Sequence, residues 1–556
     1  MGKFRSFVIL CMLCGLILLS NGVGLFRQFS GGPAVATAAA YTSFPVGAGG
    51  ADVIPHQIVR TASDRLYIFA YQGAFSSNIH AYWTNTTGLP DPNTTFSSTS
   101  LVETANPLSV EVAYDGGHII HVLDNTVDGK LNDHIFDTST NTFKATISIA
   151  TGNPAVAGDY VGTSGLSAMI GSDQSLNIAF WSAGGNITYR AYVYNDQALT
   201  LNPVNGSAQQ VNTIGSANHP ALAISPVDGS ITVAWISEAD NTPKILARSK
   251  SGGSWGEVET VSAATPWTST QGGINIDQGP SLIIDNKGTK HLAYIENYDN
   301  TGDYGRIRYA SNSGAGWSDT ALAAYTHDPA VAVNSLGEVY IIGHGHAHNA
   351  GCTSNLDMCV IKKNAGNTWD NPAIFAQHSP NNSFDTSPSV KWSVVGYNRP
   401  ETIEFIFPLA LNANYSNTVL YYGSIVSSVP PPPTLEVTST TDSGNINLAG
   451  TLSYALDKAA TGQTIIFNLT SGTTINITGK IPPVKPGVRL RYLDSKPGSG
   501  CTTPVTFDGR NVPGGANLVL GGGNIIEGLI ILTSPPGPGI VSGGTNNSIS
   551  CTKVSL

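Results

Sequence analysis

Charged residues are scarce in this sequence, and cationic residues do not outnumber acidic ones. Only 12% of the 556 residues are charged, against about 25% in an average globular protein. The 27 Lys and Arg residues against 37 Asp and Glu residues give a net charge of -10. Affinity for nucleic acid comes largely from cationic side chains that neutralise phosphates, so this balance argues against a nucleic-acid partner. It also disfavours an anionic membrane surface.

The chain begins with a pattern that is typical of an export signal. Lys3 and Arg5 precede an apolar run from Phe7 to Leu19, and the small residues of 36–38 and 38–40 are cleavage candidates. The apolar run approaches membrane-spanning length, so an uncleaved anchor is the alternative. We expect residues 1–40 to be a signal peptide or N-terminal anchor, and the protein to be secreted or held at the cell surface.

Cysteine is also scarce, with six residues in the chain. Cys11 and Cys14 lie inside the expected export signal. The other four cysteines do not have the spacing of a zinc site, and an even number in an exported chain is compatible with disulfides. We predict two bridges, each within one domain: Cys352–Cys359 and Cys501–Cys551.

Glycine (61) and proline (32) are abundant, which predicts many turns, and one pattern recurs seven times. Each copy has a small or apolar start, an apolar strand, a turn with Gly or Asp, and further short strands. The copies begin near Pro55, Pro107, Gly165, His219, Gly279, Asp328 and Ser387, with a mean period of about 55 residues.

The fourth copy shows the unit most clearly. Its expected strands are Ala221–Ile224, Ile231–Ile236, Lys244–Arg248 and Val258–Val261. Four short antiparallel strands form one blade of a β-propeller. We therefore predict an all-β fold with a seven-bladed propeller over residues 41–426. A β-sandwich, the alternative, gives no reason for a fixed repeat length. The last copy lacks a fourth strand, so we expect Tyr41–Val46 to complete it.

Three turns that close with tryptophan resemble degenerate Asp boxes. They are Ser249–Trp255, Ser311–Trp317 and Asn364–Trp369. The pattern Ser-x-Asp-x-Gly-x-Thr-Trp marks the bacterial neuraminidase repeat of sialidase-like propellers, although its Asp is missing here. The resemblance implies the propeller fold over about residues 50–426, with these turns on the face opposite the family's active site.

A proline spacer separates a second domain from the propeller. We take 427–434 as the linker, around Val429–Pro433. Beyond it, Leu435–Gly444 and Gly450–Leu456 resemble the start of exported, pectate-lyase-like, right-handed parallel β-helix domains. The resemblance implies a short parallel β-helix of about three coils over residues 435–556, and a small sandwich is the alternative. Solenoid ends normally need a cap, so we expect a partner or a missing continuation at its C-terminal end.

We expect the ligand on the propeller face where the loops that enter the first strands meet those that leave the second strands. This face is expected to be acidic and so to favour neutral or cationic ligands. The candidate ligand-binding residues are Asp124, Asp128, Glu238, Asp240, Glu296, Asp299, His327 and Asp328, with Asp133 and His219 in the same loops.

A metal site is a second expectation at this face. His344, His346 and His348 alternate with small residues, so in an extended segment all three imidazoles would point to one side. Residues 124–129 and residues 299–303 could supply oxygen ligands for calcium, although neither segment has the twelve-residue pattern of an EF-hand. A divalent metal such as calcium or zinc is therefore the alternative to solvated loops.

Two functions remain open. The first is an exported, non-catalytic protein whose propeller binds an extracellular glycan or a surface protein. The second is a divergent glycoside hydrolase of the exo-sialidase kind, using paired carboxylates. The sialidase resemblance would require three arginines that grip a carboxylate, with a Tyr–Glu nucleophile pair. Arg60 resembles the family's first arginine only weakly, and Arg306 and Arg308 share one strand face.

Overall fold

The chain is described by a computed structural model. The described residues are 40–555 except 47–55, 62, 72–77, 103–106, 127, 152–164, 183, 214–215, 239–242, 263, 267–278, 298–304, 335, 346–357, 365–366, 377–401, 411–417, 427–434, 460–462, 471, 486, 493–504, 513–517, 522–523, 528, 534–538, 543–546 and 551–552. The expected export signal and the proline linker therefore lie outside the described residues. Within the described ranges, no helix is long and apolar enough to cross a membrane.

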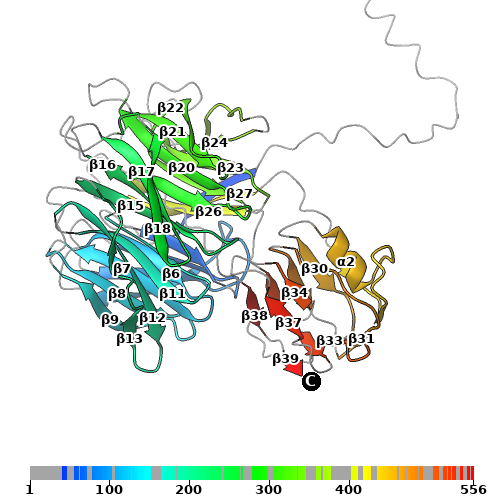
Figure 1. Ribbon diagram of the computed structural model, residues 1–556. Coiled ribbons are helices and arrows are strands. Elements are labelled where there is room, and N and C mark those ends of the chain that lie inside the picture. The colour runs from blue at the N-terminus through cyan, green and yellow to red at the C-terminus, as the bar shows by residue number, and fades with distance from the viewer. Residues whose placement is uncertain are drawn as a thin grey trace, which may run out of the picture. The chain divides into compact units, whose positions relative to one another are not determined.

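Seven antiparallel strand groups form a seven-bladed β-propeller (Figure 1). Inner strands of successive blades contact one another: β2 with β6, β6 with β10, β10 with β15, β15 with β19, and β19 with β22, while β26 contacts β2. Blade one has β2 (His56–Arg60), β3 (Leu66–Tyr71), β4 (Asn78–Thr84) and β5 (Phe96–Val102); blade two has β6 (Pro107–Tyr114), β7 (Ile119–Thr126), β8 (Leu131–Asp137) and β9 (Thr142–Ala150); blade three has β10 (Leu166–Ile170), β11 (Ser175–Ser182), β12 (Asn186–Asn195), β13 (Thr200–Pro203) and β14 (Gln209–Gln210). Blade four has β15 (Ala217–Ile224), β16 (Ile231–Ser237), β17 (Lys244–Ser251) and β18 (Ser254–Ser262); blade five has β19 (Ser281–Ile284), β20 (Lys290–Asn297), β21 (Gly305–Asn312) and the first part of β22 (Ser318–Val333). Blade six has the second part of β22, β23 (Val339–Gly345), β24 (Met358–Lys362) and β25 (Ala373–Ala376); blade seven has β26 (Thr402–Ala410), β27 (Thr418–Val426) and β1 (Ala40–Pro45).

The blade boundaries agree with the sequence repeat in the first six copies. The fourth blade matches strand by strand, because its apolar residues alternate with turns that suit glycine, such as Gly229 with φ of 70°. One feature differs from the expectation: β22 is continuous, serving as the last strand of blade five and the first of blade six. The start of the seventh copy, near Ser387, lies outside the described residues.

The tryptophans of the three degenerate turns pack between neighbouring blades. Trp255 of blade four meets Tyr189 of blade three edge-on, with ring centroids 5.5 Å apart. Trp369 of blade six meets Tyr309 of blade five in the same way at 4.9 Å. Trp317 packs against a cluster that joins blades four and five. These turns therefore stabilise the ring by filling the space between blades.

The N-terminal strand β1 completes the last blade, as the sequence predicted. It pairs antiparallel with β27, from Ala40 opposite Val426 to Pro45 opposite Tyr421. The backbone N–H of Val46 then donates to the carbonyl of Leu420 at 2.8 Å. One end of the propeller chain thus closes the ring by covering an otherwise open strand edge.

A buried ion pair also ties blade one to blade seven. Arg60, at the end of β2, donates from two guanidinium nitrogens to the carboxylate of Glu404 on β26. The hydroxyl of Tyr422 donates to the same carboxylate at 2.7 Å. Burial acts to lower the pKa of Arg60, but Glu404, with Tyr422 and Asp64, raises the net pKa. Because Arg60 is buried and committed to Glu404, it is not a substrate-binding arginine.

Residues 435–555 form a separate core between parallel strands. The first sheet contains, in order, β28 (Leu435–Val437), β30 (Thr464–Phe467), β32 (Arg489–Tyr492), β35 (Ile525–Glu527) and β38 (Ser548–Ser550). The second contains β29 (Thr441–Asp442), β31 (Thr474–Ile477), β33 (Val505–Asp508), β36 (Leu529–Leu532) and β39 (Lys553–Ser555), and the third contains β34 (Leu518–Leu520) and β37 (Ile540–Ser542). Every described pairing is parallel. This excludes the antiparallel sandwich over the described strands. The apolar run of residues 525–532 is divided between β35 and β36, which belong to two different sheets.

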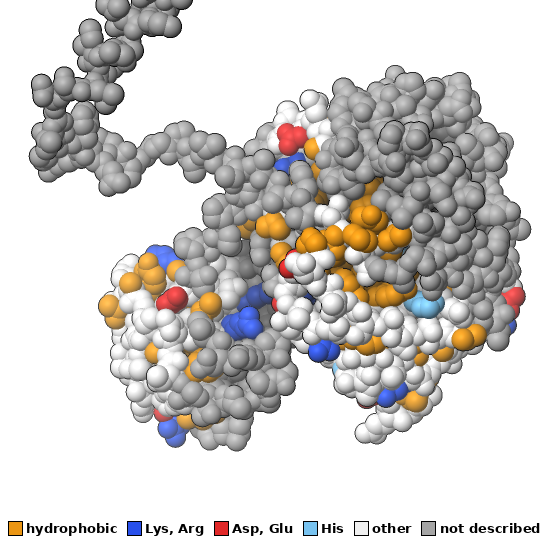
Figure 2. All heavy atoms as spheres, turned by 180° about the vertical axis from the view of Figure 1, so that it is seen from behind, with side chains coloured by type: hydrophobic (Ala, Val, Ile, Leu, Met, Phe, Trp, Pro, Cys, Tyr) orange, Lys and Arg blue, Asp and Glu red, His pale blue; other side chains and the backbone are white. Residues whose placement is uncertain are grey.

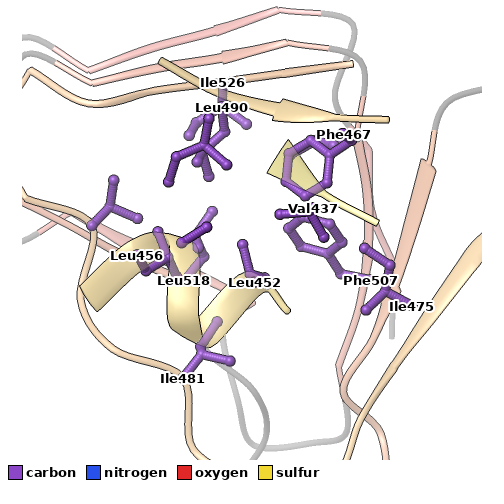
Figure 3. Packing of buried hydrophobic residues seen from close by; sticks show 14 of the residues in the cluster. Val437, Leu452, Leu456, Phe467, Ile475, Ile481, Leu490, Phe507, Leu518 and Ile526 are labelled. Atoms are coloured by element: carbon purple, nitrogen blue, oxygen red, sulfur yellow. The ribbon is translucent and has the colours of Figure 1, made fainter. Parts of the chain in front are cut away.

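A short helix, α2 (Leu452–Lys458), begins after the N-cap Thr451, whose side chain accepts from the N–H of Tyr454. Leu452 and Leu456 of this helix point into the core toward Val437 and Leu518 (Figure 3). The helix lies at the β28 end of the stack, away from β39 (Figure 1). The two segments that resemble the start of a parallel β-helix domain thus contain β28 and most of α2.

Cys359 lies buried on β24, and the other three cysteines of the predicted bridges lie outside the described residues. The bridges Cys352–Cys359 and Cys501–Cys551 therefore stay predictions.

Replacing Arg60 should destabilise the propeller strongly. Arg60→Met leaves the Glu404 carboxylate buried without its cation, which costs about 3–5 kcal/mol of unfolding free energy. The double variant Arg60→Met, Glu404→Met removes both charges and should recover most of that loss. Urea unfolding of the wild type and both variants measures this. An unchanged urea midpoint in Arg60→Met would contradict a stabilising role for the Arg60–Glu404 pair.

Candidate functional site

The candidate site lies at one end of the propeller, which we call the entry face. In antiparallel blades the start of each first strand, the end of each second strand and the start of each third strand share one end. Asn218 at the start of β15, Trp181 at the end of β11 and Glu238 just after β16 all lie at this end. The opposite end carries Arg60 and the Trp255 turn.

Two of the expected loop acids are buried strand residues. Asp124 is on β7, where it accepts from the Tyr71 hydroxyl at 2.8 Å and lies 3.3 Å from Nε2 of His134. Asp133 is on β8, with its carboxylate 2.7 Å from Nδ1 of His121. Both carboxylates are fully buried. They are therefore buried strand residues of blade two that lie beside buried histidines, and not exposed loop acids. Their part in an acidic ligand face stays a prediction.

The exposed and half-buried acids of this face are also engaged. Asp128 is exposed, and the Lys130 ammonium and the Thr126 hydroxyl lower its pKa. Oε2 of Glu296 accepts from Arg306 at 2.6 Å and from Arg308 at 3.1 Å. The shared face of the two arginines is thus confirmed.

Arg308 also donates to Asp319 at 2.7 Å. The two arginines and two carboxylates neutralise one another, so both guanidinium groups already have carboxylate partners. The network therefore opposes their use as grips for a substrate carboxylate.

The remaining predicted residues are placed only in part. Asp240, Asp299, His346 and His348 lie outside the described residues. The backbone of His327 is opposite that of His344 in the β22–β23 register, and Asp328 follows in the same strand. Among the described residues, no group of three or more His, Cys, Asp or Glu side chains could hold a metal ion. The metal site stays a prediction that the described ranges do not test.

A β-bulge distorts the entry of blade four. The β15–β16 register shifts between Asn218 and Ala221, which places His219 and Pro220 in the bulge. His219 has φ of 51°, in the left-handed region that non-glycine residues seldom occupy. Such strain and such bulges concentrate next to functional sites, where they re-aim a side chain.

The bulge brings His219 against a tryptophan of the neighbouring blade. The rings of His219 and Trp181 stack with centroids 6.4 Å apart and an interplanar angle of 30°. Asn218 donates from Nδ2 to Oε1 of Glu238 at 3.1 Å. We call these four residues, Trp181, Asn218, His219 and Glu238, the Trp181 cluster.

The Trp181 cluster contains two buried polar atoms without a hydrogen-bond partner among the described residues. Among the described residues, the buried Nε1 of Trp181 donates no hydrogen bond, and the buried Oδ1 of Asn218 accepts none. Trp181 and Glu238 remain half-buried, while Asn218 and His219 are buried. A donor, an acceptor, a carboxylate and an aromatic ring thus meet between blades three and four.

Sequence reasoning named Glu238 and His219 but missed the grouping. Trp181 also packs in part against the core between blades three and four. The signal that was available is the sequence Asn218-His219-Pro220, since a proline at a strand entry marks a bulge.

Comparison with known proteins gives fold likeness only. No known family description matches this chain, and no curated protein matches it. Among solved structures, it resembles the BP39L lectin from Burkholderia pseudomallei, with 15% identity over 68% of this chain and 97% of the lectin, at a TM-score of 0.46. It resembles the polysaccharide lyase Uly1 with 12% identity over 68% of this chain and 90% of that one, at a TM-score of 0.42. The SapL1 lectin, solved in complex with alpha methyl fucoside, matches with 11% identity over 58% and 97%, at a TM-score of 0.33. At these values no ligand or activity follows.

The buried pair in blade two should make stability depend on pH. Burial acts to lower the pKa of His121, but Asp133 and Asp115 together raise the net pKa above the ordinary 6.5. The pair's contribution is therefore complete below about pH 6.5 and is lost as pH rises through the folded-state pKa. Urea midpoints measured from pH 6 upward should fall, and less so in His121→Gln. The exposed His118 provides the control His118→Gln, which should follow the wild type. A wild-type midpoint that rises over this range would contradict the assignment.

Proposed function

We propose that this protein is an exported, non-catalytic glycan-binding protein whose propeller holds a sugar at the Trp181 cluster. The observation that carries the proposal is the strained His219 bulge, which stacks a histidine on Trp181 beside the Asn218–Glu238 pair. Ligand sites typically combine an apolar aromatic wall with a few placed polar groups.

The chemistry of the cluster suits a neutral sugar. A pyranose offers hydroxyl groups that both donate and accept, and an apolar ring face. The half-buried carboxylate of Glu238 can accept from hydroxyls, and the half-buried indole of Trp181 can pack on the ring face. On the face drawn in Figure 2, few Lys, Arg, Asp and Glu side chains stand out among the described residues.

Two observations support a non-catalytic role. Glycoside hydrolysis needs two carboxyl groups placed across the scissile bond. The described acids Asp124, Asp128, Glu238 and Glu296 are each held by a histidine, a lysine, an amide or arginines. A sialidase would also need free arginines, whereas Arg60, Arg306 and Arg308 are already committed to carboxylates. The hydrolase alternative therefore has little support from the described residues.

The proposal includes export and the architecture of the second domain. Cleavage after Ala38 would leave β1, which begins at Ala40, intact for ring closure. The fully parallel sheets of residues 435–555 are what a parallel β-helix requires, and we propose that fold with the right-handed coil implied by the resemblance. The two predicted disulfides would suit an exported chain.

A glycan array probed with the purified full chain tests the proposal, followed by calorimetric titration of the glycans that bind. Trp181→Ala should weaken binding about 10- to 100-fold, which is about 1.4–2.7 kcal/mol. Glu238→Gln should weaken it as well.

Trp255→Ala is the matched control, because Trp255 also lies between blades three and four but at the opposite end. It should leave the dissociation constant unchanged. Equal losses in both tryptophan variants, or no bound glycan at all, would contradict the site. Release of sugar from chromogenic glycosides would instead establish the hydrolase alternative.

A further inference from the structure

A hydrogen-bonded chain of four side chains crosses from blade five to blade six. Oδ2 of Asp285 lies 3.3 Å from Nε2 of His291, and Nδ1 of His291 lies 2.6 Å from the hydroxyl of Tyr309. Nζ of Lys363, just after β24 of blade six, donates to the same hydroxyl at 3.4 Å. Asp285, His291 and Tyr309 are buried, and Lys363 is half-buried. We call these four residues the Lys363 relay.

The buried end of the relay fixes the direction of its hydrogen bonds. Oδ1 of Asp285 accepts from the backbone N–H groups of Lys287 at 2.9 Å and Thr289 at 2.8 Å, and Oδ2 faces His291. Burial acts to raise the pKa of Asp285, but His291 and these N–H groups lower it, so the carboxylate stays ionised. An ionised carboxylate only accepts, so it holds the proton of a neutral His291 on Nε2. Nδ1 is then the acceptor for the proton of Tyr309.

The exposed end of the relay is a lysine packed on aromatic rings. Nζ of Lys363 lies 4.7 Å from the ring centroid of Tyr309, and Trp369 meets the other ring edge-on at 4.9 Å. Burial lowers the pKa of Lys363 and raises that of Tyr309 to about 12. Tyr309 therefore stays a neutral phenol, which can accept one proton from the lysine as it passes its own to the histidine.

The gap between blades three and four contains a matched arrangement. Nζ of Lys250 lies 4.5 Å from the ring centroid of Tyr189, and Trp255 meets that ring edge-on at 5.5 Å. Burial lowers the pKa of Lys250 as well. Lys250 and Lys363 thus share a lysine, a tyrosine and a tryptophan in the same mutual contacts.

The two gaps differ in the group behind the tyrosine. The hydroxyl of Tyr189 donates to Oδ1 of Asn177 at 2.5 Å, whereas that of Tyr309 faces His291. Asn177 and His291 occupy the same position, two residues before the strand partner of their tyrosine. An amide does not take up a proton near neutral pH, and an imidazole does. Lys363 therefore has a proton acceptor behind its tyrosine, and Lys250 has an amide there.

We propose that Lys363 is a nucleophilic lysine that accepts an acyl group from an activated ester. The ammonium first gives one proton to Tyr309, whose own proton passes to His291, and Asp285 stabilises the imidazolium that forms. The amine lone pair then attacks the ester carbonyl, and an N–C bond forms. The C–O bond breaks with its electron pair on the leaving oxygen, which takes the second ammonium proton and departs as an alcohol.

This inference goes beyond glycan binding and is independent of it. Asp285 follows β19, His291 lies near the start of β20, and Lys363 follows β24. These positions share the end of the propeller that carries the Trp255 turn, opposite the Trp181 cluster. Acylation of Lys363 therefore leaves the proposed sugar site untouched.

Labelling of the purified full chain with 4-nitrophenyl acetate tests the proposal. Peptide mass spectrometry follows the acetylation of Lys363 and Lys250 over time in the same sample. Lys363 should be acetylated about 100-fold faster than Lys250, because a positioned acid–base group contributes about that much or more. Equal rates at the two lysines in the wild type would overturn the proposal, and this comparison needs no variant.

His291→Asn rebuilds the blade-three arrangement behind Tyr309. The rate at Lys363 should then fall to that at Lys250. The pH profile of the Lys363 rate should also move upward to coincide with that of Lys250, which a loss of packing alone would not produce. His118→Gln, which changes the exposed His118 of blade two, is the control and should keep the wild-type rate at Lys363. A folded His291→Asn variant that keeps the fast rate would overturn the role of the relay.

Discussion

The closure of the propeller ring is the constraint on which the rest of this structure depends. Each blade buries its apolar faces against its two neighbours, so an open seam would expose two faces and an unpaired edge at once. β1 closes the seam by pairing with β27, and the buried Arg60–Glu404 pair joins the same two blades. Neither contact is local in the sequence. The ring is therefore held by residues from the two ends of the propeller chain.

The candidate site follows from this closed arrangement, since it belongs to no single blade. Trp181 comes from blade three, and Asn218, His219 and Glu238 come from blade four. Only neighbours held at a fixed spacing can stack Trp181 on His219 and keep donors and acceptors beside the rings. The strain at His219 is maintained by the surrounding β15–β16 pairing. At the opposite end, Trp255 packs between the same two blades, where its Nε1 already donates to Oε1 of Gln209 at 2.7 Å.

Much of the fold could be predicted from the sequence because a blade repeats a local pattern of strands and turns. The start of the first six copies, the strands of blade four and the borrowing of β1 are all confirmed. The candidate site was harder to predict than the fold, because the pairing of residues on different strands leaves no periodic pattern in the sequence. Asp124 and Asp133 look like loop acids, and only the β7–β8 pairing shows that His134 and His121 hold them in the interior. Arg60 likewise finds Glu404 more than three hundred positions away.

Native-state hydrogen exchange of the β1 amides tests ring closure most directly. If β1 is an integral strand of blade seven, its hydrogen-bonded amides open only when the propeller unfolds. They should then show the same opening free energy as the amides of β27. If the β1 amides in the intact protein have a much lower opening free energy than the β27 amides, then β1 opens on its own and is not required to hold the ring closed. Other contacts would then close the ring, which would contradict the central role of β1.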